Sequence, residues 1–231
     1  MFNCRCCSSS RINRPSDGRC GSLMPLTNKD DALIETIIKR YPRSRSAIMP
    51  LLHLAQARDG YVTPESIEVI AEKLSLETAE VNAVATFYTQ YKRKPVGEYH
   101  VGICTNTLCA VMGGDAIFEA IKEHLGVEND EVTSDGKVSV EHIECNAACD
   151  YAPVVMVNWE FYDNQTVQST KDLVDSCRAG KPIPPTRGPN ELPTWKANSE
   201  VLAGINDGKA GEGVAAGEAT LLGLKIAKGQ R

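Results

Sequence analysis

Hydrophobic residues recur at helical spacing through the first third of the chain. In the first such stretch, Leu33, Ile34 and Ile37 share one side of a helix whose first turn is acidic. Thr63 and Pro64 form a typical helix start, because a hydroxyl caps the first turn and the next residue needs no N–H. The pattern predicts four short helices, at 30–41, 44–60, 63–76 and a fourth that starts at Ser75 or Thr78 and ends near residue 88.

From residue 99 the pattern changes to the alternation typical of strands. The segments "YHVGIC" (99–104) and "KVSVEHIEC" (137–145) each predict a strand that leads into a cysteine. Between and after them we predict an amphipathic helix at 113–126, a strand pair at 153–164 and a final helix at 170–180. Strands alternating with helices indicate a small layered α/β unit, and this order of elements resembles a thioredoxin-like fold.

Composition and charge exclude several classes of function. The formal net charge is −5 and no basic stripe is present, so we do not expect a nucleic-acid partner. No apolar run approaches the length that spans a bilayer, so we expect no direct membrane insertion. The segment "GGD" (113–115) is not a dinucleotide-binding fingerprint, and no phosphate-binding loop of the P-loop type occurs.

Nine cysteines are the most informative feature of the composition. Two spaced pairs stand out, one in "CTNTLC" (104–109) and one in "ECNAACDYAP" (144–153). Cys177 stands alone on the apolar side of a predicted helix, where a buried structural thiol is the expected role. The remaining cysteines lie near the N-terminus, at Cys4, Cys6, Cys7 and Cys20, and no function is assigned to them.

Four kinds of chemistry compete for the two cysteine pairs. Zinc usually takes cysteines from tighter two-residue knuckles, and disulfides are disfavoured in a chain without a secretory segment. Burial in the core is the default for a lone thiol rather than for two pairs at strand ends. A [2Fe–2S] cluster fits best, because each of its irons takes two thiolates. The short loops can also turn backbone N–H groups toward the sulfurs, and Gly113 and Gly114 permit close backbone approach.

No other residue pattern indicates catalysis. His53, His100, His124 and His142 are not at metal-ligand spacing and form no recognisable triad with a serine or an acid. We found no nucleophile and no general acid–base pair, so we predict no catalytic residue and a role in electron transfer.

The sequence resembles the 24-kDa-type [2Fe–2S] subunit of respiratory complex I, the NuoE family. The resemblance covers residues 29–180 and is carried by "CTNTLC", "ECNAACDYAPVVMVN", "HLAQARDGYVTPESIEVIA" and "ATFYTQY". It implies that one [2Fe–2S] cluster is held by Cys104, Cys109, Cys145 and Cys149 in a thioredoxin-like domain. It also implies a non-catalytic redox subunit of NADH:quinone oxidoreductase that exchanges electrons with the flavin of its neighbour.

Partners and cofactors follow from the same resemblance. It implies contact with a flavin/NADH-binding subunit, which holds FMN and NADH, and with a multi-cluster iron–sulfur subunit of the peripheral arm. The location implied is cytoplasmic, at the inner face of the plasma membrane. Two alternatives stay open: the equivalent subunit of an NAD-reducing hydrogenase or formate dehydrogenase, and, from another class, a structural zinc-binding adaptor.

We therefore predict an α+β chain in which a helical bundle precedes a thioredoxin-like ferredoxin domain. The predicted divisions are a disordered or mis-called N-terminal tail at 1–28, a helical docking domain at 29–94, a thioredoxin-like [2Fe–2S] domain at 95–181 and an extended or disordered C-terminal tail at 182–231. The arginine- and serine-rich start of the chain and the more ordinary sequence that begins at Met24 are the reasons for the first division.

Overall fold

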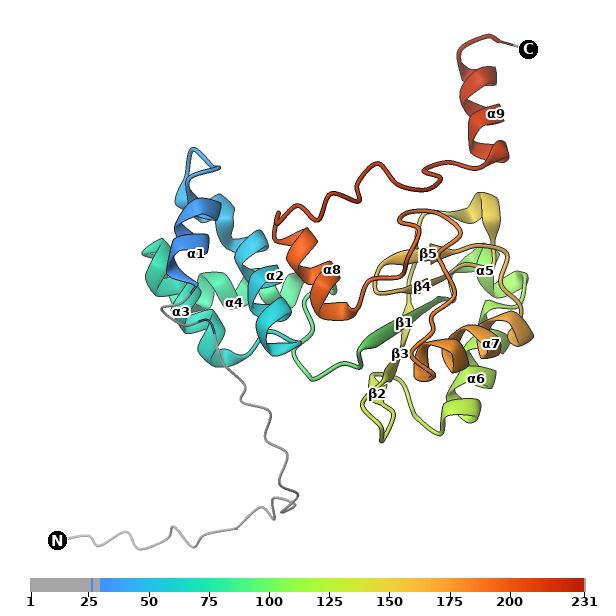
Figure 1. Ribbon diagram of the computed structural model, residues 1–231, viewed down its shortest axis with the longest axis horizontal. Coiled ribbons are helices and arrows are strands. Elements are labelled where there is room, and N and C mark those ends of the chain that lie inside the picture. The colour runs from blue at the N-terminus through green and yellow to red at the C-terminus, as the bar shows by residue number, and fades with distance from the viewer. Residues whose placement is uncertain (1–25, 27–29, 231) are drawn as a thin grey trace, which may run out of the picture.

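A computed structural model describes residue 26 and residues 30–230 (Figure 1). The expectations for the tail at 1–28 therefore lie almost wholly outside the described residues, as do Cys4, Cys6, Cys7 and Cys20. Leu26, which is described, is buried in the core of the helical unit. Within the described part of the chain, no helix combines the length and the apolar character that crossing a membrane requires.

The first part of the chain forms a helical unit, seen at the left of Figure 1. Its elements are α1 (Asp31–Ile38), the 3₁₀ turn η1 (Ser44–Ala47), α2 (Ile48–Asp59), α3 (Pro64–Leu74) and α4 (Thr78–Phe87). The four predicted helices are present, although the first ends three residues earlier than expected. Thr63 caps α3 by accepting a hydrogen bond of 3.1 Å from the Ser66 N–H. Pro50 is the third residue of α2, where a missing N–H costs no helical hydrogen bond.

The second part is a five-stranded sheet with strand order β2-β3-β1-β4-β5. The strands are β1 (Tyr99–Cys104), β2 (Glu131–Val132), β3 (Val138–Ile143), β4 (Val155–Val157) and β5 (Glu160–Tyr162). The central pair β1 and β3 is parallel, and every other pair is antiparallel. The helices of this unit are α5 (Thr107–Val111), α6 (Gly114–Leu125) and α7 (Val167–Arg178), and the 3₁₀ turn η2 covers Cys149–Tyr151.

Alternation along β1 and β3 gives the two faces of the sheet different partners. Val101 and Val140 lie in the apolar core with Ile121 of α6 and Leu173 of α7. The alternate residues, such as His100, point to the opposite face, which lies toward the helical unit. Both faces are covered, because the residues that link the two units and the C-terminal segment pack on the second face.

The C-terminal segment differs from the extended or disordered tail expected at 182–231. It contains two helices, α8 (Trp195–Leu202) and α9 (Glu218–Ala227). The helix α8 packs against α2, and its first residue, Trp195, is buried and donates from its indole to the Gly60 carbonyl at 2.7 Å. Proline density correctly indicated irregular chain over 182–193, but the helix signal of Thr194, a capping hydroxyl before an apolar residue, was missed.

Asn158, in the turn between β4 and β5, joins the sheet to the C-terminal segment. Its side-chain oxygen accepts the His100 backbone N–H at 2.7 Å, and its side-chain amide donates to the carbonyls of Glu98 and Pro193 at 3.1 and 2.8 Å. Its own carbonyl accepts a hydrogen bond from Asn198 of α8. The residue is fully buried with φ of 51°, a conformation that asparagine tolerates better than most residues.

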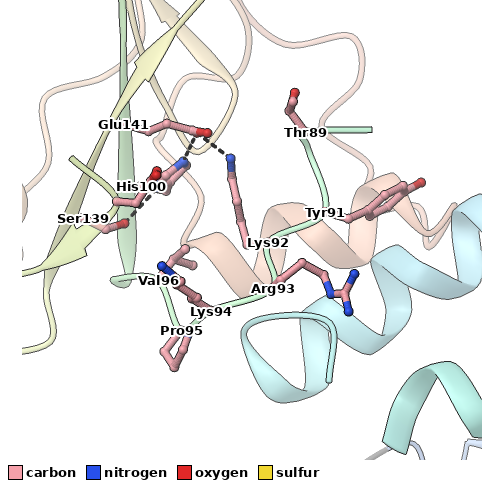
Figure 2. Close-up of a pocket in the computed structure, with 11 residues that line it drawn as sticks. Thr89, Tyr91, Lys92, Arg93, Lys94, Pro95, Val96, His100, Ser139 and Glu141 are labelled. Atoms are coloured by element: carbon pink, nitrogen blue, oxygen red, sulfur yellow. Dashed lines mark hydrogen bonds and ion pairs between the residues drawn. The ribbon is translucent and has the colours of Figure 1, made fainter. Parts of the chain in front are cut away.

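A buried polar network on the same face of the sheet was not predicted from the sequence (Figure 2). The two ring nitrogens of His100 lie 2.8 Å from Ser139 Oγ and 2.8 Å from Glu141 Oε2. Lys92, in the segment that links the two units, donates to the same carboxylate at 2.5 Å. Because Glu141 is an acceptor, we assign the ring proton to Nε2, and Nδ1 accepts from the Ser139 hydroxyl. Ser139 Oγ in turn accepts the Gly97 N–H at 3.1 Å.

Burial sets the protonation of this network. Burial lowers the pKa of His100, and the hydrogen bond to Glu141 offsets only part of that shift. Burial alone would raise the pKa of Glu141, but the His100 hydrogen bond and the Lys92 charge outweigh it, so this pKa lies below its usual value. The folded protein therefore holds a neutral imidazole and an ionised carboxylate, which is the combination that satisfies every donor described above.

We predict that this network makes folding stability depend on pH. An unfolded histidine takes up a proton below about pH 6.5, whereas folded His100 does not until a lower pH, so stability falls as pH drops below about 6.5. In urea unfolding between pH 5 and 6.5, His100→Gln should flatten this dependence by up to about 1.4 kcal/mol per pH unit, the limit for one proton. The exposed His142→Gln serves as the control and should follow the wild-type curve. Parallel curves for wild type and His100→Gln would contradict the assignment.

Candidate metal centre at the cysteine loops

The parallel pairing of β1 and β3 brings the two cysteine loops to one edge of the sheet. In this register Cys104, the last residue of β1, lies opposite Ile143, the last residue of β3. Cys145 follows two residues later. Because both strands run in the same direction, the loops that leave them begin side by side.

The first loop returns quickly toward the sheet through the short helix α5. Asn106 caps this helix by accepting the Thr107 N–H at 2.7 Å, and Cys109 lies in its first turn. Cys104 and Cys109 are both buried, each 3% exposed. They pack in a small apolar cluster whose other buried members are Ala148, Ala152 and Val154. The second loop therefore covers the sulfurs of the first.

Main-chain hydrogen bonds hold the two loops together. The Cys104 N–H donates to the Val154 carbonyl at 3.1 Å, and the Thr105 N–H donates to the Ile143 carbonyl at 3.2 Å. Cys104 Sγ lies 4.0 Å from the Glu144 carbonyl oxygen, next to Cys145 in the sequence. The start of the first loop is thus bonded to Ile143, which precedes the second cysteine pair, and to Val154, which follows it.

The pKa of Cys109 reflects the approach of the other thiols. Burial raises it to about 11, the Val154 backbone N–H that bonds the sulfur opposes the shift, and interactions with Cys104 and Cys149 add to it. Ala148, which precedes Cys149, packs against Cys104 and Cys109, so the end of the second loop lies near the first. A neighbouring positive centre, such as a metal ion, would reverse this shift and favour the thiolate.

A backbone N–H group of the second loop points at one of the four sulfurs. The Ala147 N–H donates to Cys145 Sγ at 3.3 Å, and Ala147 adopts a φ of 52° that turns its N–H inward. The Val154 backbone N–H acts on Cys109 in the same sense, by lowering the pKa of its thiol. The expectation that the second loop turns its backbone toward a sulfur is confirmed by Ala147. Such donors stabilise thiolates and tune the potential of an iron–sulfur centre.

Two glycines allow the loop to pack against α6. Gly113 has a φ of 109° at the helix N-terminus, a conformation that side chains disfavour. At Gly114, an added Cβ would lie 2.4 Å from the Cys104 carbonyl oxygen and 2.9 Å from that of Cys109. The sequence predicts that Gly113 and Gly114 allow close backbone approach or set the helix start. Gly114 provides the close approach, and Gly113 is the N-cap residue at the start of α6.

The residues at this edge fit a [2Fe–2S] cluster. All four thiols are free, two are buried, and Cys145 and Cys149 are exposed at the rim. Among the described residues, no three His, Cys, Asp or Glu side chains gather closely enough to hold one metal ion. A two-iron cluster needs only two thiolates at each iron, so two separate pairs match its donor requirement.

Cys177 is remote from this edge. It lies on α7 in the apolar core between helix and sheet and is fully buried. Burial raises its pKa to about 12. The expectation of a structural core thiol is confirmed.

A pocket of about 250 Å³ lies beside the His100 network, on the face of the sheet that meets the linking segment (Figure 2). Lys92, His100, Ser139 and Glu141 line it, together with apolar side chains such as Pro95. The polar groups of the network already form hydrogen bonds with one another. Sequence patterns could not have identified the His100 network, because Glu141 follows His100 by 41 residues and only strand pairing brings the two side chains together.

Comparisons with known proteins agree with this geometry. The profile of the thioredoxin-like [2Fe–2S] ferredoxin family matches residues 34–178. The E-type subunit of NADH-quinone oxidoreductase from Mycobacterium tuberculosis is 60% identical over 193 residues, 83% of this chain and 76% of that protein. The corresponding protein of Rickettsia bellii is 43% identical over 153 residues, 65% of this chain and 92% of that protein.

A solved structure supports the fold alone. The crystal structure of an NAD⁺-reducing [NiFe]-hydrogenase in the air-oxidized state matches with a TM-score of 0.52 and 21% identity, over 62% of this chain and 25% of that one. The resemblance and the α+β fold predicted from the sequence are both confirmed. Because the family profile extends from the first helices through both cysteine loops, the chain belongs to the family of thioredoxin-like [2Fe–2S] ferredoxins.

Proposed function

We propose that this chain is the subunit of an NADH:quinone oxidoreductase that carries one [2Fe–2S] cluster, and that Cys104, Cys109, Cys145 and Cys149 hold it. The observation that carries the proposal is the meeting of two cysteine loops at the end of the parallel strands β1 and β3. The 60% identity to the NADH-quinone oxidoreductase protein of Mycobacterium tuberculosis supports the choice of enzyme. The cluster, when bound, accepts and donates single electrons.

The chain's own residues would hold and tune this centre without chemistry of their own. The sheet fixes Cys104, and the caps of α5 and α6 fix the path of the first loop. The Ala147 N–H stabilises negative charge on the Cys145 sulfur. The exposed side, at Cys145 and Cys149, is open to an electron-transfer partner. We propose that the subunit has no catalytic residue.

Partners would supply the remaining cofactors. We propose that an adjacent flavin/NADH-binding subunit holds FMN and NADH, and that a multi-cluster iron–sulfur subunit also adjoins the chain. The division at 29–94 and 95–181 belongs to this proposal, with the helical unit as the docking part. The exposed Phe87 on α4, 77% accessible beside Tyr88, is consistent with such a role. The chain would then work at the inner face of the plasma membrane.

The two alternatives receive less support. Likeness to the NAD⁺-reducing hydrogenase is a likeness of fold, whereas the identity to NADH-quinone oxidoreductase subunits is high over most of the chain. A structural zinc adaptor uses the same thiols, and metal analysis of the purified protein separates it from an iron protein.

Substitution of the proposed ligands tests the cofactor. The purified chain should contain iron and acid-labile sulfide and absorb visible light, and Cys145→Ala or Cys149→Ala should reduce the bound iron at least ~tenfold. Cys177→Ala, which removes a buried thiol remote from the loops, is the matched control and should retain the cluster. Stoichiometric zinc in a colourless protein, or equal loss in all three variants, would contradict the proposal.

Gly114→Ala tests how closely α6 must pack on the first loop. The added Cβ would meet backbone oxygens at 2.4 and 2.9 Å, so we expect a loss of about 1–3 kcal/mol in unfolding free energy. Iron content should fall as well, because Cys104 and Cys109 are displaced. Gly223→Ala in α9, where no atom lies within 4 Å, is the control and should leave both measurements unchanged or slightly raise stability. Equal behaviour of the two variants would refute this packing.

Purification with native partners tests the enzyme assignment. An affinity-tagged chain expressed in its own organism should yield a complex that contains FMN and reduces ferricyanide with NADH. The isolated chain should do neither, because the proposal places flavin and NADH on the partner. Nickel in the complex would favour the hydrogenase alternative, and NADH oxidation by the isolated chain would refute the assignment of these cofactors.

A further inference from the structure

The C-terminal helix α9 begins directly against the turn that contains Cys149. The Ala219 N–H donates to Tyr151 Oη at 3.1 Å, and Thr220 Oγ1 donates to Asp150 Oδ2 at 2.6 Å. Figure 1 shows α9 rising from this end of the sheet, away from the helical unit. The two residues that follow Cys149 are thus both bonded to the first turn of one helix.

Gly217, just before the helix, lies very close to the end of the Tyr151 side chain. A Cβ added at Gly217 would lie 2.1 Å from Tyr151 Oη. Residues before it are also held to the body, because the Gly188 N–H donates to the Val214 carbonyl at 3.1 Å. The segment that leads into α9 therefore packs along the edge of the sheet next to the second cysteine loop.

Tyr151 is held from its other side as well. The guanidinium of Arg187 lies 5.4 Å from the centre of the Tyr151 ring and 4.5 Å from that of Phe161. Arg187 is itself paired with Asp163 at 2.7 Å, and both side chains are largely buried. The Tyr151 carbonyl accepts the Asn164 N–H at 2.8 Å. Arg187 thus contacts the Tyr151 ring, while the start of α9 contacts its hydroxyl.

The cysteine loop itself has little main-chain support. Among the described residues, the N–H groups of residues 144–148 donate to no backbone carbonyl, and that of Ala147 bonds Cys145 Sγ instead. Cys145, Cys149 and Asp150 are exposed. The position of the second pair of thiols must therefore depend on contacts from outside the loop.

We propose that Tyr151 and Asp150, held by Thr220 and the first turn of α9, are positioning residues that fix the Cys149 side of the cluster site. This inference rests on the proposed function, in which Cys149 is a ligand. The C-terminal segment then sets the orientation of an exposed thiolate that the sheet does not reach. It thereby sets the spectroscopic properties of the bound centre, although none of its residues is a ligand.

The test compares full-length variants that remove one contact each. Thr220→Val removes the hydroxyl that bonds Asp150, Tyr151→Phe removes the oxygen that accepts the Ala219 N–H, and Thr220→Ser keeps the hydroxyl. Thr36→Val is the control, because it removes a similar bond, to the Ala32 carbonyl at 2.7 Å, in distant α1. Amide hydrogen exchange of Tyr151, whose N–H donates to the Ala148 carbonyl at 3.0 Å, is measured for each variant, together with the EPR spectrum and midpoint potential of the reduced protein.

We expect Thr220→Val and Tyr151→Phe to raise exchange of the Tyr151 amide about fivefold, the factor that corresponds to one net hydrogen bond. Both should shift the EPR spectrum or the potential, while Thr220→Ser and Thr36→Val should match wild type. Raised exchange without any spectroscopic shift would show a merely structural contact and overturn the proposal, as would unchanged exchange. A wild-type chain without a cluster would instead overturn the proposed function. The exchange measurement does not depend on the cluster, so the two failures can be distinguished.

Discussion

The parallel pairing of β1 with β3 is the constraint on which the rest of the structure depends. It places the ends of two strands, separated by nearly forty residues of chain, at one edge of the sheet. A slip of one residue in this pairing would exchange the two faces of β3. It would then move Val140 out of the apolar core and break the contact between His100 and Glu141. The same register that buries the core thus also assembles the cysteine edge.

The second face of the sheet shows why this register is stable despite its polar residues. A polar side chain buried without partners costs free energy, but His100, Ser139 and Glu141 satisfy one another. Lys92, in the segment that links the two units, is bonded to Glu141. On the same face of the sheet, the Asn158 carbonyl accepts a hydrogen bond from Asn198 of α8. The helical unit is therefore held on the sheet by directional bonds as well as by apolar contact.

Local patterns were enough to predict the elements that carry local signals. The strand at 99–104, the helix that ends before Gly126 and the four N-terminal helices have the spacing, caps and stops that identify them. The cysteine edge was also predictable, since parallel strands end together. The His100 network and the docking of Trp195 onto Gly60 were not, because they join residues that are distant in sequence. The short helices α8 and α9 lie in a segment whose glycine and proline content dominates the pattern.

The four thiols differ in what holds them. Cys104 and Cys109 are buried and fixed by the sheet, by α5 and by the glycine contact with α6. Cys145 and Cys149 are exposed on a loop with few main-chain bonds. A rigid pair keeps a centre in place, while an exposed pair lets a partner approach it, and electron transfer needs both. Under the proposed function, the less supported pair is also the one whose geometry outside contacts can alter, so contacts to this loop would adjust the redox properties of the cluster without changing a ligand.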